Sequence, residues 1–162
     1  MTPSLPLPQG ARIGHVHLKV SDLAQSIAFY RDALGLELQQ LYGDQAAFLS
    51  FDGYHHHLGL NTWHSAGGPR PAPDATGLYH TAFLFPDRIA LAQALRRALA
   101  AGVQIEGAAD HGVSEAIYFS DPDGNGIEIY RDRAPQDWPR DRDGQIAMVN
   151  MRLDLEELLL LA

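Results

Sequence analysis

Histidine offers the widest range of chemistry of any residue type in this sequence, and its placement is uneven. The chain has eight histidines, three of them consecutive at positions 55–57, and no cysteine. Without thiols, disulfides and cysteine-bound zinc are excluded, so any metal ion must be held by imidazole and carboxylate groups. Such ligands favour a harder ion such as Fe(II), Mn(II) or Zn(II).

Two of the histidines lie in stretches of sequence that match each other. GHVHLKVSDL in the first part of the chain aligns with YHTAFLFPDR in the second, so that His15 matches His80 and Asp22 matches Asp87, each pair 65 residues apart. In both stretches a strand-like segment ends at an aspartate that is placed to cap a following helix. A matched histidine and a matched capping residue indicate an internal duplication.

Each matched stretch continues into the same series of elements. Apolar residues at three- and four-residue spacing predict one helix that stops at Gly35 and a second that stops at Gly102. Three short strand candidates follow each helix, namely Leu36–Tyr42, Ala46–Phe51 and His56–Trp63 in the first copy and Val103–Gly107, Ala116–Ser120 and Gly126–Arg131 in the second. The sequence therefore predicts an α+β fold built from two βαβββ modules.

The predicted organisation is one domain with an extension at each end, which suits a chain of 162 residues. Residues 1–12 form an N-terminal extension. The domain spans 13–131, with module one at 13–63, a Gly- and Pro-rich linker at 64–77 and module two at 78–131. Residues 132–162 form a polar tail that ends in a short amphipathic helix. The leucines of that helix need a partner surface, either in the domain itself or in a second subunit.

Charge and hydropathy exclude several classes of protein. The net charge of −8 is spread along the chain, which argues against a nucleic-acid partner. The opening segment lacks the apolar region of a signal peptide, and no apolar run approaches the length needed to cross a membrane. We therefore expect a cytoplasmic protein without a membrane partner.

On the segments HVHLKVSDLAQSIAFYRDALGL and YFSDPDGNGIEIY, the sequence resembles the vicinal-oxygen-chelate superfamily. This superfamily includes glyoxalases, bleomycin-resistance proteins, fosfomycin-resistance enzymes and extradiol dioxygenases. The resemblance covers residues 13–131 and implies a cup-shaped, partly closed mixed-sheet barrel around a divalent metal. The ligands that it implies are His15 and His80, on the first strand of each module, and Glu128, on the last strand. A buried, unpaired carboxylate is costly, so Glu128 in an otherwise apolar strand agrees with a metal partner.

A set of two histidines and one carboxylate leaves neighbouring positions open on the metal. A substrate with two adjacent oxygens can chelate there, and dioxygen or water can bind beside it. Zinc glyoxalases of this superfamily use four protein ligands, whereas HHHLGL carries no carboxylate at the fourth position. The resemblance therefore favours Fe(II), with Mn(II) as the alternative.

Within the superfamily the sequence is most similar to extradiol catechol dioxygenases. The signature of those enzymes is a His followed by a Tyr that lies ten residues before the carboxylate ligand. Here Tyr118 lies ten residues before Glu128, and His111 lies seven before Tyr118. The resemblance implies that His111 and Tyr118 orient the substrate oxygens through hydrogen bonds.

The same enzymes carry an acid–base histidine on the last strand of the first module, and the match HHLGL places His56 there. Strict strand alternation would instead turn His57 inward together with Gly59. A β-bulge would present His56, and we favour His56 as the catalytic histidine.

The activity implied by the resemblance is ring cleavage of a small aromatic diol by dioxygen. One alternative is a glyoxalase-like, metal-dependent lyase or isomerase, and another is a metal-free binding protein of the bleomycin-resistance type. Extradiol enzymes of this family are about twice as long and have an additional module pair, so this chain resembles the short, single-pair members. The terminal leucines are compatible with a homodimer.

Overall fold

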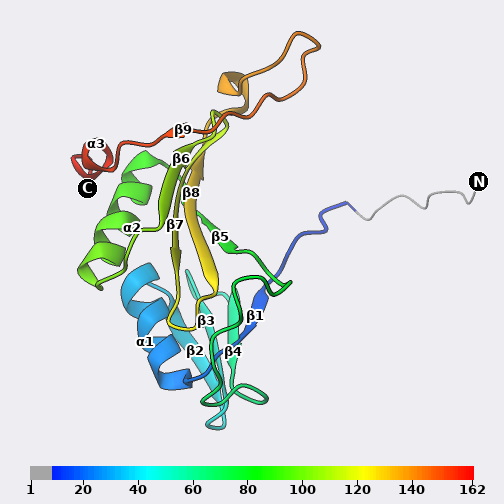
Figure 1. Ribbon diagram of the computed structural model, residues 1–162, viewed down its shortest axis with the longest axis vertical. Coiled ribbons are helices and arrows are strands. Elements are labelled where there is room, and N and C mark those ends of the chain that lie inside the picture. The colour runs from blue at the N-terminus through cyan, green and yellow to red at the C-terminus, as the bar shows by residue number, and fades with distance from the viewer. Residues whose placement is uncertain (1–8) are drawn as a thin grey trace, which may run out of the picture.

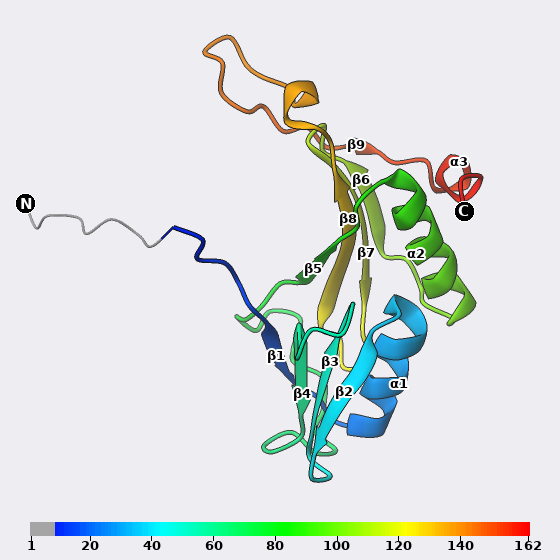
Figure 2. The same ribbon diagram turned by 180° about the vertical axis from the view of Figure 1, so that it is seen from behind.

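Two open β-sheets with both long helices on one side form the body of the computed structural model (Figures 1 and 2), which describes residues 9–162. The first eight residues of the predicted N-terminal extension lie outside the described residues. Module one contains β1 (Val16–Lys19), α1 (Leu23–Leu34), β2 (Glu37–Tyr42), β3 (Ala46–Ser50) and β4 (Leu58–Asn61). Module two contains β5 (Thr81–Leu84), α2 (Arg88–Ala100), β6 (Gly107–Asp110), β7 (Ser114–Ser120) and β8 (Gly126–Asp132).

The two sheets repeat one topology. Their strand orders are β1-β4-β3-β2 and β5-β8-β7-β6, and the second sheet continues into a short strand from the tail, β9 (Met151–Arg152). In each module the first and last strands pair in parallel and the remaining pairs are antiparallel. The predicted α+β fold of two βαβββ modules is confirmed, and the sheets are not closed into a barrel.

The helix ends predicted from the sequence are confirmed. Asp22 and Asp87 adopt extended backbone conformations, and their side chains accept hydrogen bonds from the backbone N–H three residues later. Gly35 ends the first helix with a φ of 80°, in the left-handed region that glycine occupies without strain. Ala101 caps the second helix, and Gly102 follows it in the same left-handed conformation.

The strand predicted at Val103–Gly107 is displaced towards the C-terminus. The buried Val103 donates its N–H to the carbonyl of Ala98, so it completes the helix end instead of starting a strand. Sheet pairing begins at Glu106, whose N–H donates to the Tyr118 carbonyl at 2.8 Å, and β6 occupies Gly107–Asp110. Helix capping and core packing therefore outweigh the strand propensity of this segment.

The core lies between the sheets and the helices and is shared by both modules. Ile117, Phe119, Ile127 and Ile129 on β7 and β8 are almost completely buried within it. Because neighbouring residues on a strand point to opposite faces, the residues between these positions point away from the helices. That second face carries Tyr118 and Glu128.

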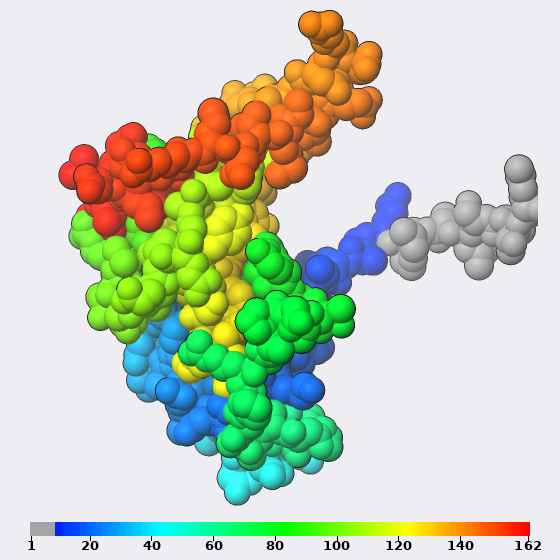
Figure 3. All heavy atoms as spheres, in the orientation of Figure 1, coloured from blue at the N-terminus to red at the C-terminus, as the bar shows by residue number. Residues whose placement is uncertain are grey.

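The tail leaves β8 as an extended arm and then returns across one end of module two (Figure 3). It contains a 3₁₀ turn (Pro135–Asp137), strand β9 paired with β6, and the short helix α3 (Leu155–Leu159). Leu158 is fully buried, and Arg96 on α2 donates to the Leu159 carbonyl at 3.1 Å. The domain itself therefore supplies a partner surface for the terminal helix. Among residues 9–162, the helices are too short or too polar to cross a membrane.

Candidate active site

His80 and Glu128 meet on the face of the second sheet that is turned away from the helices. His80 directly precedes β5, and Ala82 on β5 is the register partner of Glu128 on β8. Since side chains alternate along a strand, His80, two residues before Ala82, shares a face with Glu128. The two side chains are in contact, with 2.9 Å between His80 Nε2 and Glu128 Oε2, and the Glu128 side chain is only 12% exposed.

Tyr118 and His111 extend this pair into a chain of four polar side chains. Tyr118 on β7 lies directly opposite Glu128 in the antiparallel register, and its hydroxyl is 3.4 Å from Glu128 Oε1. The same hydroxyl is 2.9 Å from Nε2 of His111, which sits in the turn between β6 and β7. The structure therefore brings together four of the six predicted site residues.

The Tyr118 hydroxyl is held in its neutral form. Burial, followed by the nearby Glu128 carboxylate, raises the pKa of Tyr118 to about 12. A phenol in this state carries a proton throughout the physiological range and can donate one hydrogen bond. Tyr118 is thus a permanent donor between an imidazole and a carboxylate.

The other two predicted residues, His15 and His56, form a separate pair on module one. Their ring centroids are 4.5 Å apart, and the His56 ring also lies 5.0 Å from that of Phe48. His57 is used differently, because its Nδ1 accepts a hydrogen bond from the Phe51 N–H at 3.2 Å. The structure thus places His56, rather than His57, beside His15.

Burial lowers the pKa of His56, and the positive charge that neighbouring His15 and His55 would carry lowers it further. The His56 imidazole therefore stays neutral at pH 7 and is able to accept a proton.

The structure does not gather the three predicted metal ligands into one cluster. His80 and Glu128 are in contact, whereas His15 is exposed and lies against His56. Within the part of the chain that the structure describes, no group of three or more His, Cys, Asp or Glu side chains is close enough to hold a metal ion.

Two of the predicted ligands nevertheless suit a metal. Imidazole and carboxylate together are a donor set for Fe(II) and Mn(II). Among residues 9–162 the buried Nδ1 of His80 has no hydrogen-bond partner, so Nε2, which faces the carboxylate, is the nitrogen through which this imidazole interacts.

The position in module one that corresponds to Glu128 in module two is occupied by a glycine. By the repeat, Gly59 takes the place of Glu128, and its register partner His17 takes the place of Ala82. A Cβ atom at Gly59 would lie 2.8 Å from the His17 ring, so no larger side chain fits there without a shift of that ring. Phe48, opposite Gly59, corresponds to Tyr118 without its hydroxyl. Module one therefore lacks a carboxylate at the position of a fourth ligand, as the sequence predicted.

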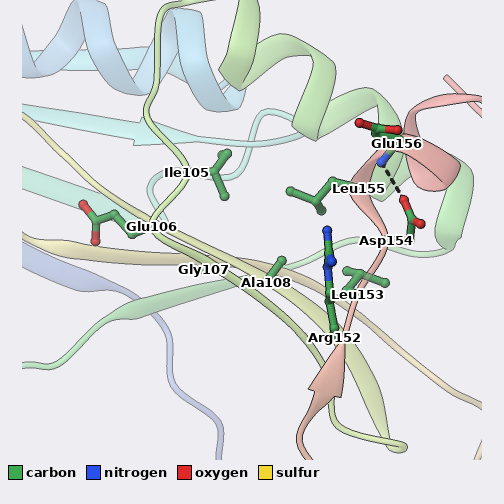
Figure 4. A pocket seen from close by; sticks show the side chains of 9 residues that line it. All are labelled: Ile105, Glu106, Gly107, Ala108, Arg152, Leu153, Asp154, Leu155 and Glu156. Carbon is green, nitrogen blue, oxygen red and sulfur yellow. Dashed lines mark hydrogen bonds between the residues drawn. The ribbon is translucent and has the colours of Figure 1, made fainter.

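A surface pocket of 470 Å³ lies away from these residues, between the 105–108 segment and residues 152–156 of the tail (Figure 4). It contains none of the six predicted site residues. The pocket lies where the tail packs against the domain. The hydrogen bond drawn in Figure 4 runs from the Glu156 N–H to the Asp154 side chain, which caps α3.

Comparison with known proteins identifies the family to which this chain is related. Residues 12–129 match the family model described as Glyoxalase/Bleomycin resistance protein/Dioxygenase superfamily. The chain belongs to this superfamily. It is 42% identical over 151 residues to the catechol-2,3-dioxygenase of Bacillus subtilis (strain 168), an alignment that covers 93% of this chain and 52% of the relative. It is 33% identical over 122 residues to biphenyl-2,3-diol 1,2-dioxygenase 3 of Rhodococcus globerulus, covering 75% of this chain and 63% of the relative. The chain thus spans between about half and two thirds of these relatives' lengths.

Two solved structures share this fold. The lactoylglutathione lyase of Agrobacterium tumefaciens superposes with a TM-score of 0.60 at 26% identity, covering 76% of this chain and 96% of that one. A glyoxalase/dioxygenase from Nostoc punctiforme superposes with a TM-score of 0.65 at 24% identity, covering 83% and 100%. The superposition therefore extends over almost the whole length of both solved chains.

Proposed function

We propose that this chain is a metal-dependent extradiol dioxygenase domain that cleaves a catechol-type aromatic diol with dioxygen, in the cytoplasm. The observation that carries the proposal is the continuous chain His80–Glu128–Tyr118–His111 on one face of module two. The similarity to proteins named catechol-2,3-dioxygenase and biphenyl-2,3-diol 1,2-dioxygenase supports it.

The proposed metal ligands are His80, Glu128 and His15. The first two already face each other across neighbouring parallel strands. His15 is the repeat counterpart of His80 and precedes β1, the edge strand that corresponds to β5. Fe(II) is the proposed ion and Mn(II) the alternative. When bound, the ion would supply a Lewis-acidic centre for the two diol oxygens and the redox chemistry that dioxygen requires.

The chain's own residues handle protons and orientation. His56 is the proposed base for a diol hydroxyl, because its lowered pKa keeps the imidazole neutral at pH 7. Tyr118 keeps its proton, and its oxygen can accept a hydrogen bond from a substrate hydroxyl near Glu128, while His111 holds the Tyr118 hydroxyl at 2.9 Å. In the overall reaction one ring carbon–carbon bond next to the diol breaks, and both oxygen atoms of dioxygen enter the ring-opened product.

A glyoxalase-like lyase or isomerase is the second candidate. The extent of the domain favours it, since this chain covers 96% of a lactoylglutathione lyase but 52% of the catechol-2,3-dioxygenase. The Gly59–His17 contact argues against it, because it leaves no room for a fourth ligand of the kind that the resemblance assigns to zinc glyoxalases.

A metal assay followed by a catechol panel tests the proposal. Protein purified without oxygen should carry about one Fe or Mn per chain and should turn catechols into yellow, ring-opened products in air. Replacement of His80, Glu128 or His15 by Ala should remove most of the bound metal, since a three-ligand site cannot spare one. His64→Ala, an exposed histidine of the linker, is the matched control and should bind metal normally.

Two results would contradict the proposal. Absence of transition-metal binding when Fe(II) is supplied would exclude the dioxygenase and the lyase together. Metal binding without ring cleavage across the panel would favour the lyase or isomerase.

A further inference from the structure

The tail passes directly beside His111 and forms two hydrogen bonds with it. The N–H of Val149 donates to the carbonyl of His111 at 3.0 Å. The carbonyl of Val149 lies 3.0 Å from His111 Nδ1. Val149 is 38 residues away in the sequence. Its N–H binds the backbone of His111, and its carbonyl binds the ring of the same histidine.

A backbone carbonyl can only accept a hydrogen bond, so it selects the form of His111 that has a proton on Nδ1. We propose that the C-terminal segment is a positioning element for catalysis, in which the Val149 carbonyl fixes the tautomer and orientation of His111. This inference rests on the proposed function, because it assigns the tail a part in the same site.

The fixed tautomer determines where the Tyr118 proton goes. With Nδ1 protonated, Nε2 of neutral His111 presents a lone pair, and the Tyr118 hydroxyl at 2.9 Å must be the donor. That hydroxyl has a single proton, and the competing Glu128 oxygen is farther away at 3.4 Å. The Glu128 carboxylate is therefore left free to act as a ligand, and the Tyr118 oxygen keeps lone pairs for a substrate hydroxyl.

The position of Val149 is secured on both sides. On its C-terminal side, β9 pairs with β6, and Leu153 and Leu158 are buried in the domain. Closer to the histidine, a Cβ atom at Gly112 would lie 2.8 Å from Cγ of Pro139 and 3.2 Å from Cγ2 of Val149. The turn that carries His111 therefore accepts the tail at this distance only because residue 112 is glycine.

Gly112→Ala tests the proposal because the added methyl group pushes against the tail. Gly112 has a φ of 75°, so alanine there is also strained, and Gly102→Ala is the matched control. Gly102 has a φ of 81°, and no atom of the described residues lies within 4 Å of its Cβ position, so this variant carries the same backbone strain without the contact. A third protein combines Gly112→Ala with Pro139→Ala and Val149→Ala, which removes the opposing side-chain atoms and keeps the Val149 carbonyl.

The direct measurement is the tautomer of His111, read from the ¹⁵N chemical shifts of histidine-labelled protein that has been freed of paramagnetic ions. The His111 signal is assigned by its loss in His111→Gln. We expect a proton on Nδ1 in the unchanged protein and in Gly102→Ala, and a mixture of tautomers in Gly112→Ala. Turnover of catechol in Gly112→Ala should fall by about a hundredfold, the size of effect expected when a catalytic group is displaced by about 1 Å. Metal content should not change, and the triple variant should regain most of the turnover.

Two outcomes would overturn the inference. The first is a proton on Nε2 of His111 in the unchanged protein, which can be observed even if Gly112→Ala does not fold. The second is a folded Gly112→Ala with the same tautomer and turnover as Gly102→Ala. The tautomer is measured without substrate, so the first outcome and the tautomer comparison in the second do not depend on the proposed reaction. A chain with His111 protonated on Nδ1 but without ring cleavage would remove the proposed function and leave the Val149 contact established.

Discussion

Replacement of Tyr118 by Phe separates substrate orientation from acid–base chemistry in the candidate site. The substitution keeps the ring on β7 and removes only the hydroxyl, which lies 2.9 Å from His111 Nε2 and 3.4 Å from Glu128 Oε1. The first distance is that of a normal hydrogen bond and the second is beyond the usual range. One neutral hydrogen bond is therefore lost.

The expected effect follows from that single bond. A neutral hydrogen bond contributes about 0.5–1.5 kcal/mol. If the bond is fully formed in the transition state, its loss lowers kcat/KM by a factor of about 2 to 13, since about 1.4 kcal/mol corresponds to tenfold. Because burial and Glu128 raise the pKa of Tyr118 to about 12, the hydroxyl does not ionise below pH 10. The unchanged protein and Tyr118→Phe should therefore have pH–rate profiles of the same shape between pH 6 and 10.

The assay is steady-state formation of the yellow product in air-saturated buffer, with metal content measured on the same samples. Tyr130→Phe is the matched control, because Tyr130 lies on β8 two residues beyond Glu128 but outside the hydrogen-bonded chain, and it should lose little activity. A loss of a thousandfold or more in Tyr118→Phe with normal metal content would refute this reasoning, because it would show that Tyr118 transfers its proton during the reaction.

Three further predictions concern the histidines and the contact between modules. His56→Ala should lower turnover by about two to four powers of ten with normal metal content, and the control His57→Ala should have little effect on turnover. Loss of metal from His56→Ala would instead make His56 a ligand and favour a lyase. Tyr30→Phe removes a buried hydrogen bond of 2.9 Å to the Asp121 carboxylate, which joins α1 to the turn before β8, and should lower the free energy of unfolding in urea by about 1.5–3 kcal/mol. A loss below about 0.5 kcal/mol would mean that this contact does not hold the modules together. Burial and the neighbouring His15 lower the pKa of His17, and the pKa of His56 is lowered in the same way, so the unfolded chain binds protons more readily at these positions. The protein should therefore keep its full stability above pH 6.5 and lose stability as the pH falls below 6.5. The urea midpoint of His17→Asn should change less between pH 7.5 and 5.5 than the urea midpoint of the unchanged protein.

The duplicated fold could be predicted from the sequence because its signals are local. Asp22, Gly35 and Asp87 cap helices through bonds to residues within one helical turn, and the matched spacing of His15 and His80 reports the repeat directly. The pairing of Tyr118 with Glu128 follows from a short hairpin between adjacent strands. Interactions over such short separations leave a pattern in the sequence itself.

Which of His56 and His57 lies beside His15 depended on the tertiary structure. The register pairs of β4 begin at Leu58, and the backbone of His57 still forms hydrogen bonds with Val16 and Leu49 on the two neighbouring strands. Side-chain alternation therefore does not extend to His56, the first of the two histidines. They follow a turn in which Asp52 and Gly53 both have positive φ, and this turn directs His56 towards His15. Alternation can be applied only where a strand is already paired, and the sequence does not show where pairing starts.

Contacts between distant segments were likewise decided by the tertiary structure alone. His80 and Glu128 meet because β5 and β8 pair in parallel across 46 residues, whereas His15 lies against His56 instead of completing the set. Val149 contacts His111 through backbone atoms, which every residue possesses, so no side-chain pattern could have identified it. The sequence determines which chemical groups are present and which elements carry them. The path of the chain in space decides which of these groups meet, because each contact depends on the packing of segments that have no pattern in common.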